Sequence, residues 1–191
     1  MSLAVRHANA LAGLAAILAA LALSGVALAQ DRSVEYGVKA AYLQKFAPFV
    51  AWPSSAFTSP TSPFLLCVLG RDPFGTTLDQ AVSGQSIGGH PMVVRRLDHV
   101  DGASGCHILY LGTSRSQSAA AALQAVRGAP TLTVTDGAPA GAVIQFAVKG
   151  SRVRFDIDIG AAAANRLTIS SKLLALAMSV RSDPGPPSGQ S

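Results

Sequence analysis

"FLLCVLG", residues 64–70, is a continuous apolar run that ends at a glycine. This pattern is typical of a β-strand that is buried on both faces, since a strand with one wet face alternates apolar and polar residues. "CHILYLG", residues 106–112, shows the same pattern further along the chain. Strands of this kind occur in parallel sheets that helices cover on both sides. The two runs therefore indicate an α/β fold.

The segments around these runs alternate between helical and extended patterns. The predicted elements are a helix over 73–84, a strand over 90–97 ("HPMVVRRL"), a helix over 114–128 and a strand over 130–136 ("PTLTVTD"). We expect Ser114 or Ser116 to cap the second helix and Gly128 to end it. This order of elements predicts strand–helix–strand units around the two buried strands.

The last third of the chain changes its pattern. Residues 142–159, "AVIQFAVKGSRVRFDIDI", predict a hairpin that turns at Gly150. Its second strand alternates apolar residues with four charged ones, which predicts one wet face: Arg152, Arg154, Asp156 and Asp158. Residues 167–180 favour a final amphipathic helix. The expected fold is a single α/β domain whose mixed, mostly parallel sheet is flanked by helices on both faces.

"KAAYLQKFAPFVAWP", residues 39–53, concentrates aromatic side chains in a predicted helix. The apolar face of that helix consists of Val38, Tyr42, Phe46, Phe49 and Val50, while Lys39, Gln44 and Lys45 lie mostly outside it. Pro48 predicts a kink near Ala47, and Pro53 ends the element. We interpret the apolar face as packing on the sheet. Trp52, at the end of the helix, is the candidate for partial exposure and for binding a partner.

The N-terminus has the pattern of a secretory signal peptide. A basic start, an apolar middle and small residues before Gln30 predict cleavage after Ala29, so that residues 1–29 are removed. The predicted α/β domain then spans 30–181. Residues 182–191 form a tail whose composition is typical of disorder. An exported chain with two cysteines, Cys67 and Cys106, is expected to hold a disulfide, with two free buried thiols as the alternative.

The charge pattern and the motifs point away from several kinds of chemistry. The net charge is +5, but the basic residues are scattered, so we expect no nucleic-acid binding. "GQSIG", residues 84–88, matches G-x-S-x-G, yet the strand before Ser86 and the helix after it that a nucleophile elbow requires are absent. Asp136 and one of the histidines at 90, 99 and 107 could complete a catalytic triad with Ser86, but nothing in the sequence places them together. We therefore expect no enzyme, no cofactor and no metal. A small ligand near Gly70 or Gly112, at the ends of strands, remains an alternative.

The chain resembles the YfiR-like family of periplasmic regulators in six blocks that follow one another in family order. The family hallmark corresponds to "VKAAYLQKFAPFVAWP" (38–53), and the other blocks are "LCVLGRDPFG", "CHILYLG", "PTLTVTD", "VRFDIDI" and "LTISSKLLALA". The resemblance covers roughly Val34 to Val180. It departs from the founding member, which has a second disulfide near a "GGMI" turn where this chain reads "GAPAGAVI" without cysteines.

The resemblance implies a function by protein–protein contact. The founding member represses a membrane-bound diguanylate cyclase by binding its periplasmic portion, and a peptidoglycan-associated outer-membrane lipoprotein sequesters the repressor. Sequestration of the repressor releases the cyclase, and cyclic di-GMP output and biofilm formation follow from that release. Family members typically form homodimers, and their conserved disulfide corresponds to Cys67 and Cys106. A periplasmic small-molecule binding module that feeds a membrane sensor is the alternative, and a hydrolase that uses Ser86 is a third hypothesis.

Overall fold

The computed structural model describes residues 32–137 and 141–182. The predicted signal peptide, residues 1–29, lies outside them, as does the predicted tail apart from Ser182. The chain divides into two compact units, 1–36 and 37–191. Residues 32–36 of the first unit are helical, and the second unit contains every strand that the structure describes.

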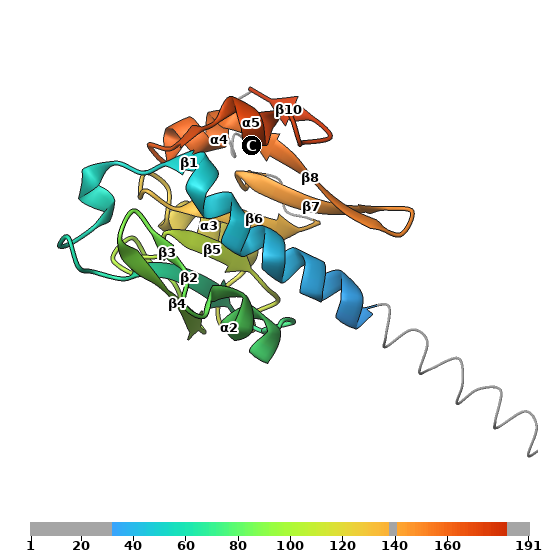
Figure 1. The fold of residues 1–191 in the computed structure, drawn as a ribbon, viewed down its shortest axis with the longest axis horizontal. Helices are drawn as coiled ribbons and strands as arrows, with labels where there is room; N and C mark the ends of the chain where they lie inside the picture. Colours follow the sequence, from blue (N-terminus) through green and yellow to red (C-terminus); the bar gives the residue numbers. More distant parts are fainter. Residues whose placement is uncertain (1–31, 138–140, 183–191) are drawn as a thin grey trace, which may run out of the picture. The chain divides into compact units, whose positions relative to one another are not determined.

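An eight-stranded mixed sheet organises the described part of the second unit (Figure 1). Its strand order is β10-β8-β7-β6-β5-β2-β4-β3. The strands are β2 (Phe64–Leu69), β3 (Ser86–Ile87), β4 (His90–Leu97), β5 (Ile108–Leu111), β6 (Leu132–Asp136), β7 (Ile144–Lys149), β8 (Arg152–Asp158) and β10 (Val180–Arg181). The run from β4 to β7 is parallel, whereas the β3–β4 and β7–β8 pairs are antiparallel. The predicted mixed, mostly parallel α/β fold is confirmed.

Helices cover both faces of the sheet. They are α2 (Thr76–Val82), α3 (Ala119–Ala125), α4 (Ile159–Ala164) and the short α5 (Ser171–Leu174). The chain leaves β2 toward β4 on one side and leaves β5 toward β6 on the other, so right-handed crossovers place α2 and α3 on opposite faces. α3 packs on the face that presents Leu69 and Leu109. On the other face, the Phe74 ring before α2 meets the Tyr110 ring of β5, with centroids 4.7 Å apart.

The aromatic stretch begins as a helix and changes geometry at the predicted place. Residues 37–46, which we call the signature helix, continue into a 3₁₀ helix, η1 (Ala47–Phe49), and then β1 (Val50–Ala51). Pro48 lies in the first turn of η1, where its missing N–H is tolerated. β1 pairs with β9 (Thr168–Ile169) in a separate two-stranded sheet. A second 3₁₀ turn, η2 (Ser54–Ala56), follows β1.

The predicted final helix over 167–180 is wrong. Residues 168–169 instead form β9 against β1, and the hydroxyl of Ser170 caps the single turn of α5. The backbone N–H of Ile157 then bonds to the carbonyl of Ser179, which draws the chain into β10 beside β8. Pairing with two distant strands therefore overrides the local helical pattern.

Two helix caps also differ from expectation. Ser118, not Ser114 or Ser116, caps α3 through the N–H of Ala121. Asp158, predicted on the wet face of β8, is buried and caps α4, which was not predicted, by accepting from the N–H of Ala161 at 2.8 Å. A carboxylate at this position satisfies one of the free N–H groups of a helix start. The alanine run after Asp158 was the signal for this helix.

Candidate functional site

The central strands have the order at which α/β sheets commonly bind ligands. Counting only the parallel strands in chain order, β4-β2-β5-β6-β7 has the flavodoxin-like order 2-1-3-4-5. The switch point lies between β2 and β5, whose connections leave toward opposite faces. In such folds ligands bind beyond the carboxyl ends of these two strands. Gly70 and Gly112, named as the alternative ligand site, follow β2 and β5 there.

In this protein the two loops close on each other at that point. The N–H of Gly112 bonds to the carbonyl of Leu69 at 3.0 Å, and the N–H of Arg71 bonds to the carbonyl of Thr113 at 2.8 Å. A Cβ on Gly112 would lie 2.6 Å from the carbonyl oxygens of Leu69 and Arg71. The glycines therefore serve close backbone packing between the loops, and chain atoms fill the space beside both of them.

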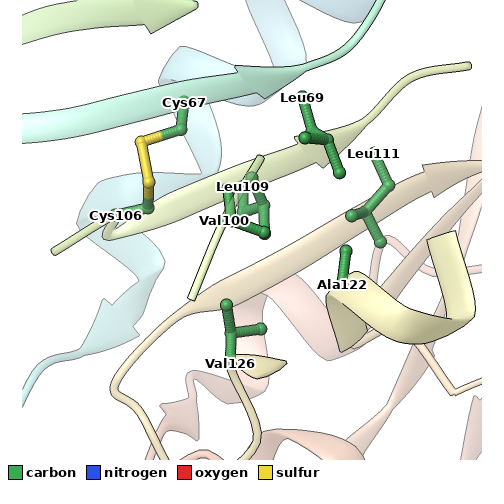
Figure 2. Close-up of a cluster of buried hydrophobic side chains, with 8 residues drawn as sticks. All are labelled: Cys67, Leu69, Val100, Cys106, Leu109, Leu111, Ala122 and Val126. Carbon is green, nitrogen blue, oxygen red and sulfur yellow. A yellow bond between two sulfur atoms is a disulfide. The ribbon is translucent and has the colours of Figure 1, made fainter. Parts of the chain in front are cut away.

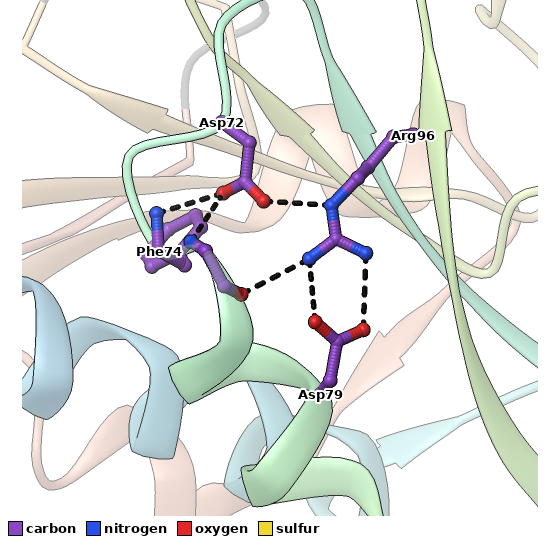
Figure 3. A network of polar contacts seen from close by, with 5 residues as sticks. Asp72, Phe74, Asp79 and Arg96 are labelled. Carbon is purple, nitrogen blue, oxygen red and sulfur yellow. Dashed lines mark hydrogen bonds and ion pairs between the residues drawn. The ribbon is translucent and has the colours of Figure 1, made fainter.

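An arginine on the neighbouring strand fastens the same loop from outside (Figure 3). Arg96 of β4 bonds to Asp72 at 2.7 Å, to both carboxylate oxygens of Asp79 on α2 at 2.7 and 3.0 Å, and to the carbonyl of Gly75. Asp72 in turn accepts from the backbone N–H of Phe74. Hydrogen bonding to Arg96 lowers the pKa of Asp79, and the two carboxylates raise that of Arg96. This clamp holds the 70–75 loop and α2 against β4.

Cys67 and Cys106 form a disulfide beneath α3, which agrees with the pairing that the resemblance implies (Figure 2). Cys67 lies on β2, Cys106 lies two residues before the start of β5, and their Cα atoms are 5.8 Å apart. Both are buried in an apolar cluster whose other members are Leu69, Val100, Leu109, Leu111, Ala122 and Val126. The bond therefore joins the two central strands within the core.

The signature helix and the residues after it bury most of the predicted apolar face, including Phe46 and Val50, but the first turn of the helix departs from the prediction. Lys39, expected mostly outside the apolar face, is fully buried, whereas Val38 is 41% exposed. The ammonium of Lys39 lies 2.6 Å from a carboxylate oxygen of Asp136 at the end of β6 and 5.9 Å from the centre of the Phe146 ring. One helical turn further, Tyr42 and Phe46 pack against Phe146 and Phe155 of the β7–β8 hairpin.

Trp52, the candidate for partner binding, is half-buried. Its indole N–H donates to the carbonyl of Ala47 at 3.2 Å, and its ring meets the edges of Phe64 and His107 at centroid distances of 5.2 and 5.9 Å. One part of the indole thus belongs to the core, and the rest reaches the surface. Its role toward a partner stays a prediction.

The residues of the hypothetical catalytic triad, Ser86, a histidine and Asp136, do not come together in the structure. Ser86 lies on β3 and is exposed, next to the Gly88–Gly89 turn that leads into β4. His90 and His107 lie at the amino ends of β4 and β5, whereas Asp136 lies at the carboxyl end of β6 and pairs with Lys39. These strands are parallel, so His90 and His107 lie at the opposite end of the sheet from Asp136. His99, the third candidate histidine, follows the carboxyl end of β4, whereas Ser86 pairs with Pro91 near the amino end of that strand. The G-x-S-x-G match is a hairpin, not a nucleophile elbow.

Two further searches of the described residues concern metal binding and membrane crossing. In residues 32–137 and 141–182, no three His, Cys, Asp or Glu side chains come close enough to hold a metal ion. The same residues contain no helix with the length and apolar character that a membrane crossing needs. What the geometry offers instead is a rigid, disulfide-linked sheet with aromatic side chains at its amino edge.

Comparison with known families identifies the domain. The family model described as YfiR/HmsC-like matches residues 36–178. The chain belongs to the YfiR/HmsC-like family. The match spans the signature helix and the sheet as far as the segment before β10. Proteins of the YfiR-like family are periplasmic, and they are regulators rather than enzymes. A search of the curated proteins returned no match.

Sequence patterns did not reveal three features of this site. The burial of Lys39 depends on Asp136, which is 97 residues away. The Arg96 clamp likewise depends on two carboxylates in a different element, and the burial of His107 depends on the loop that covers it. No spacing rule connects such residues. The residues around Lys39 do not indicate that its side chain is buried either.

Proposed function

We propose that this protein is a periplasmic signalling regulator that binds and represses a membrane-bound diguanylate cyclase and thereby controls cyclic di-GMP output and biofilm formation. The observation that carries the proposal is the family match over 36–178, which includes the hallmark helix. The absence of an assembled triad among the described residues and the closed glycine loops at the switch point both favour a role in binding proteins over catalysis.

The proposed partners are those that the family resemblance implies. The proposed primary partner is the periplasmic portion of an inner-membrane diguanylate cyclase or sensor, and a peptidoglycan-associated outer-membrane lipoprotein is the proposed sequestering partner. A homodimer is the proposed working form. Export by residues 1–29 places the protein in the compartment in which these partners and a stable disulfide occur.

Deletion of the gene, with measurement of cyclic di-GMP, tests the proposal. A repressor predicts that cyclic di-GMP and biofilm rise in the deletion strain and fall again when the full chain is supplied. A chain without residues 1–29 is expected not to restore repression, because it stays on the wrong side of the membrane. Unchanged cyclic di-GMP in the deletion strain, with no membrane cyclase co-purifying with the tagged protein, would contradict the proposal.

Trp52 supplies the test for the partner surface. Trp52→Phe retains an aromatic ring against Phe64 but shortens the exposed part and removes the indole N–H. If Trp52 contacts the partner, this variant keeps a cooperative unfolding transition but captures less of the cyclase. Ser86→Ala, at an exposed position on β3, is the control and should leave capture unchanged. Equal capture by Trp52→Phe and the wild type would remove Trp52 from the partner surface.

The small-molecule alternative has one specific feature in its favour, the flavodoxin-like strand order. The backbone contacts of Gly70 and Gly112 count against the switch point as its location. A thermal-shift screen of small metabolites decides between the two hypotheses. A ligand that raises the melting temperature, and whose effect Gly112→Ala abolishes in a folded variant, would support the alternative.

A further inference from the structure

An uncharged segment covers the amino ends of three strands of the sheet. Residues 52–63, "WPSSAFTSPTSP", which we call the strap, contain no acidic, basic or histidine residue. Trp52 of the strap contacts Phe64, the first residue of β2. Phe57 contacts His90, the first residue of β4, and His107, which precedes β5. The strap is therefore fastened to the sheet largely through two histidine rings.

The phenyl ring of Phe57 lies between these histidines. Its centroid is 3.8 Å from that of His90, with 11° between the ring planes, and 4.6 Å from that of His107, with 28°. Phe64 stacks on His107 at 4.7 Å. Four stacked rings thus join the strap to β2, β4 and β5. Neutral imidazoles suit this arrangement, because burying a charged ring among apolar ones has a high desolvation cost.

The hydrogen bonds of the two histidines respond differently to a proton. Nδ1 of His90 lies 2.7 Å from the carbonyl oxygen of Ser62, which can only accept, so Nδ1 of His90 carries a hydrogen. A second proton on His90 would go to Nε2 and leave this bond intact. Nδ1 of His107, in contrast, accepts from the backbone N–H of Leu65 at 3.0 Å. Protonation there would set two donors against each other.

His107 is also poorly placed to hold a charge. Its side chain is 4% exposed, and its Nε2, which carries the hydrogen in the neutral ring, is buried without a hydrogen-bond partner in the described structure. Burial lowers the pKa of His107 below its ordinary value, and the charge of His90 adds to this effect. The backbone of Ala56 acts in the opposite direction and raises this pKa, but by less than burial lowers it.

Other charged groups on the surrounding strands are engaged elsewhere. β2 and β5 carry no charged side chain. On β4, Arg95 donates to the carbonyl of Ser104, and Arg96 is held by Asp72 and Asp79. On β6, Asp136 lies at the opposite end and pairs with Lys39. His90 is therefore the titratable group on these elements that faces His107.

We propose that the strap is an acid-released cover: protonation of His107 breaks its bond to Leu65, places a charge in the aromatic stack and detaches residues 52–63 from the amino edge of the sheet. Detachment exposes Phe57, Phe64 and the buried side of Trp52. This inference concerns a conformational change of the chain itself and does not depend on the proposed partner. It would give the proposed regulator a surface that pH controls.

Hydrogen exchange of the strap measures the release directly. We expect deuterium uptake of peptides within 54–63, corrected for the intrinsic pH dependence of exchange, to rise at least several-fold between two pH values, one of 7.5 and one well below 6.5, because the pKa of His107 is lowered from its ordinary value. Peptides from α3 should show no comparable rise. In His107→Asn, whose amide oxygen can still accept from Leu65 but does not titrate, the rise should disappear. His99→Asn, at an exposed histidine, is the matched control and should retain it.

Equal corrected uptake of the wild-type strap at the two pH values would overturn the proposal, as would a rise that persists in a folded His107→Asn variant. If His107→Asn does not fold, the wild type alone decides. Imidazole resonances of His107 and amide resonances of the strap are followed together through the titration. A common midpoint supports the proposal, and strap amides that stay unchanged while His107 titrates refute it.

Discussion

The ammonium of Lys39 is fully buried and lies 2.6 Å from a carboxylate oxygen of Asp136, whose own side chain is 27% exposed. The pair joins the signature helix to the carboxyl end of β6. Water can therefore solvate the carboxylate of Asp136 when Lys39 is removed, but it cannot reach the ammonium of Lys39 when Asp136 is removed. Removing the carboxylate leaves a charge in the core, whereas removing the ammonium leaves a carboxylate that water reaches.

This asymmetry predicts unequal costs for the two single variants. Asp136→Asn should lower the free energy of unfolding by about 3–5 kcal/mol, the range for breaking a buried ion pair by removing one member. Lys39→Met should lower it by only about 1–2 kcal/mol. Urea unfolding of both variants measures the difference. Lys45→Met, on the exposed side of the same helix, is the control, with a change within about 0.5 kcal/mol. Equal losses for Asp136→Asn and Lys39→Met would contradict the prediction.

Reduction of the disulfide should destabilise the protein without changing its sequence. Cys67 and Cys106 are 39 residues apart, and closing a loop of this size restricts the unfolded chain by roughly 4 kcal/mol on the chain-entropy description. Urea unfolding of the oxidised and reduced wild type gives this difference. A Cys67→Ala/Cys106→Ala variant is the control, because reductant should not change its stability. Two free thiols in the natively purified protein would refute the premise.

The closure of the switch point predicts that a single methyl group is harmful there. Gly112 does not need a left-handed backbone, so Gly112→Ala tests the close approach of the two loops alone. We expect a loss of about 1–3 kcal/mol in unfolding free energy from the forced backbone shift. Gly102→Ala, whose Cβ would find only one atom at 3.5 Å, should change stability by less than about 0.5 kcal/mol. A neutral Gly112→Ala would show that the loops separate easily and would reopen the ligand hypothesis.

The Arg96 clamp predicts an acid-sensitive and salt-sensitive contribution. Because the folded state lowers the pKa of Asp79 below 3.8, the stabilisation by Asp79 is complete above that pH and is lost as the pH falls below it. Arg96→Gln should remove this part of the pH dependence and make stability less sensitive to salt. The side chains are 40% and 47% exposed, so the loss at neutral pH should be modest, about 1 kcal/mol. Thermal unfolding between pH 2.5 and 7 tests this.

Arg95→Gln is the control for that experiment. Arg95 is the neighbour of Arg96 on β4, and its guanidinium donates to the carbonyl of Ser104, outside the clamp. Its variant should follow the pH dependence of the wild type. If Arg95→Gln and Arg96→Gln lost the same acid-sensitive component, general charge would explain the effect and not the clamp.

Local patterns were sufficient where an element is defined by its own residues. The apolar runs of β2 and β5 correctly predicted strands that are buried on both faces, and Gly150 correctly predicted the β7–β8 turn. Both predictions succeeded because the side-chain period and the backbone freedom are properties of a few consecutive residues. Pro48 correctly marked the change in the signature helix for the same reason. The strands that carry or follow Cys67 and Cys106 are neighbours because the sheet has the flavodoxin-like order, which neither apolar run determines by itself.

Tertiary contacts decided what local patterns left open. Residues 168–181 would satisfy a helix by themselves, but hydrogen bonds to Phe49, Phe155 and Ile157 convert most of them to strands and a single turn. Lys39 occupies the core because Asp136, remote in sequence, meets it there. The strap covers His107, and this burial lowers the pKa of its imidazole. In each case the deciding energy is a pairing or a burial between distant residues, and such energies exist only after the chain has folded.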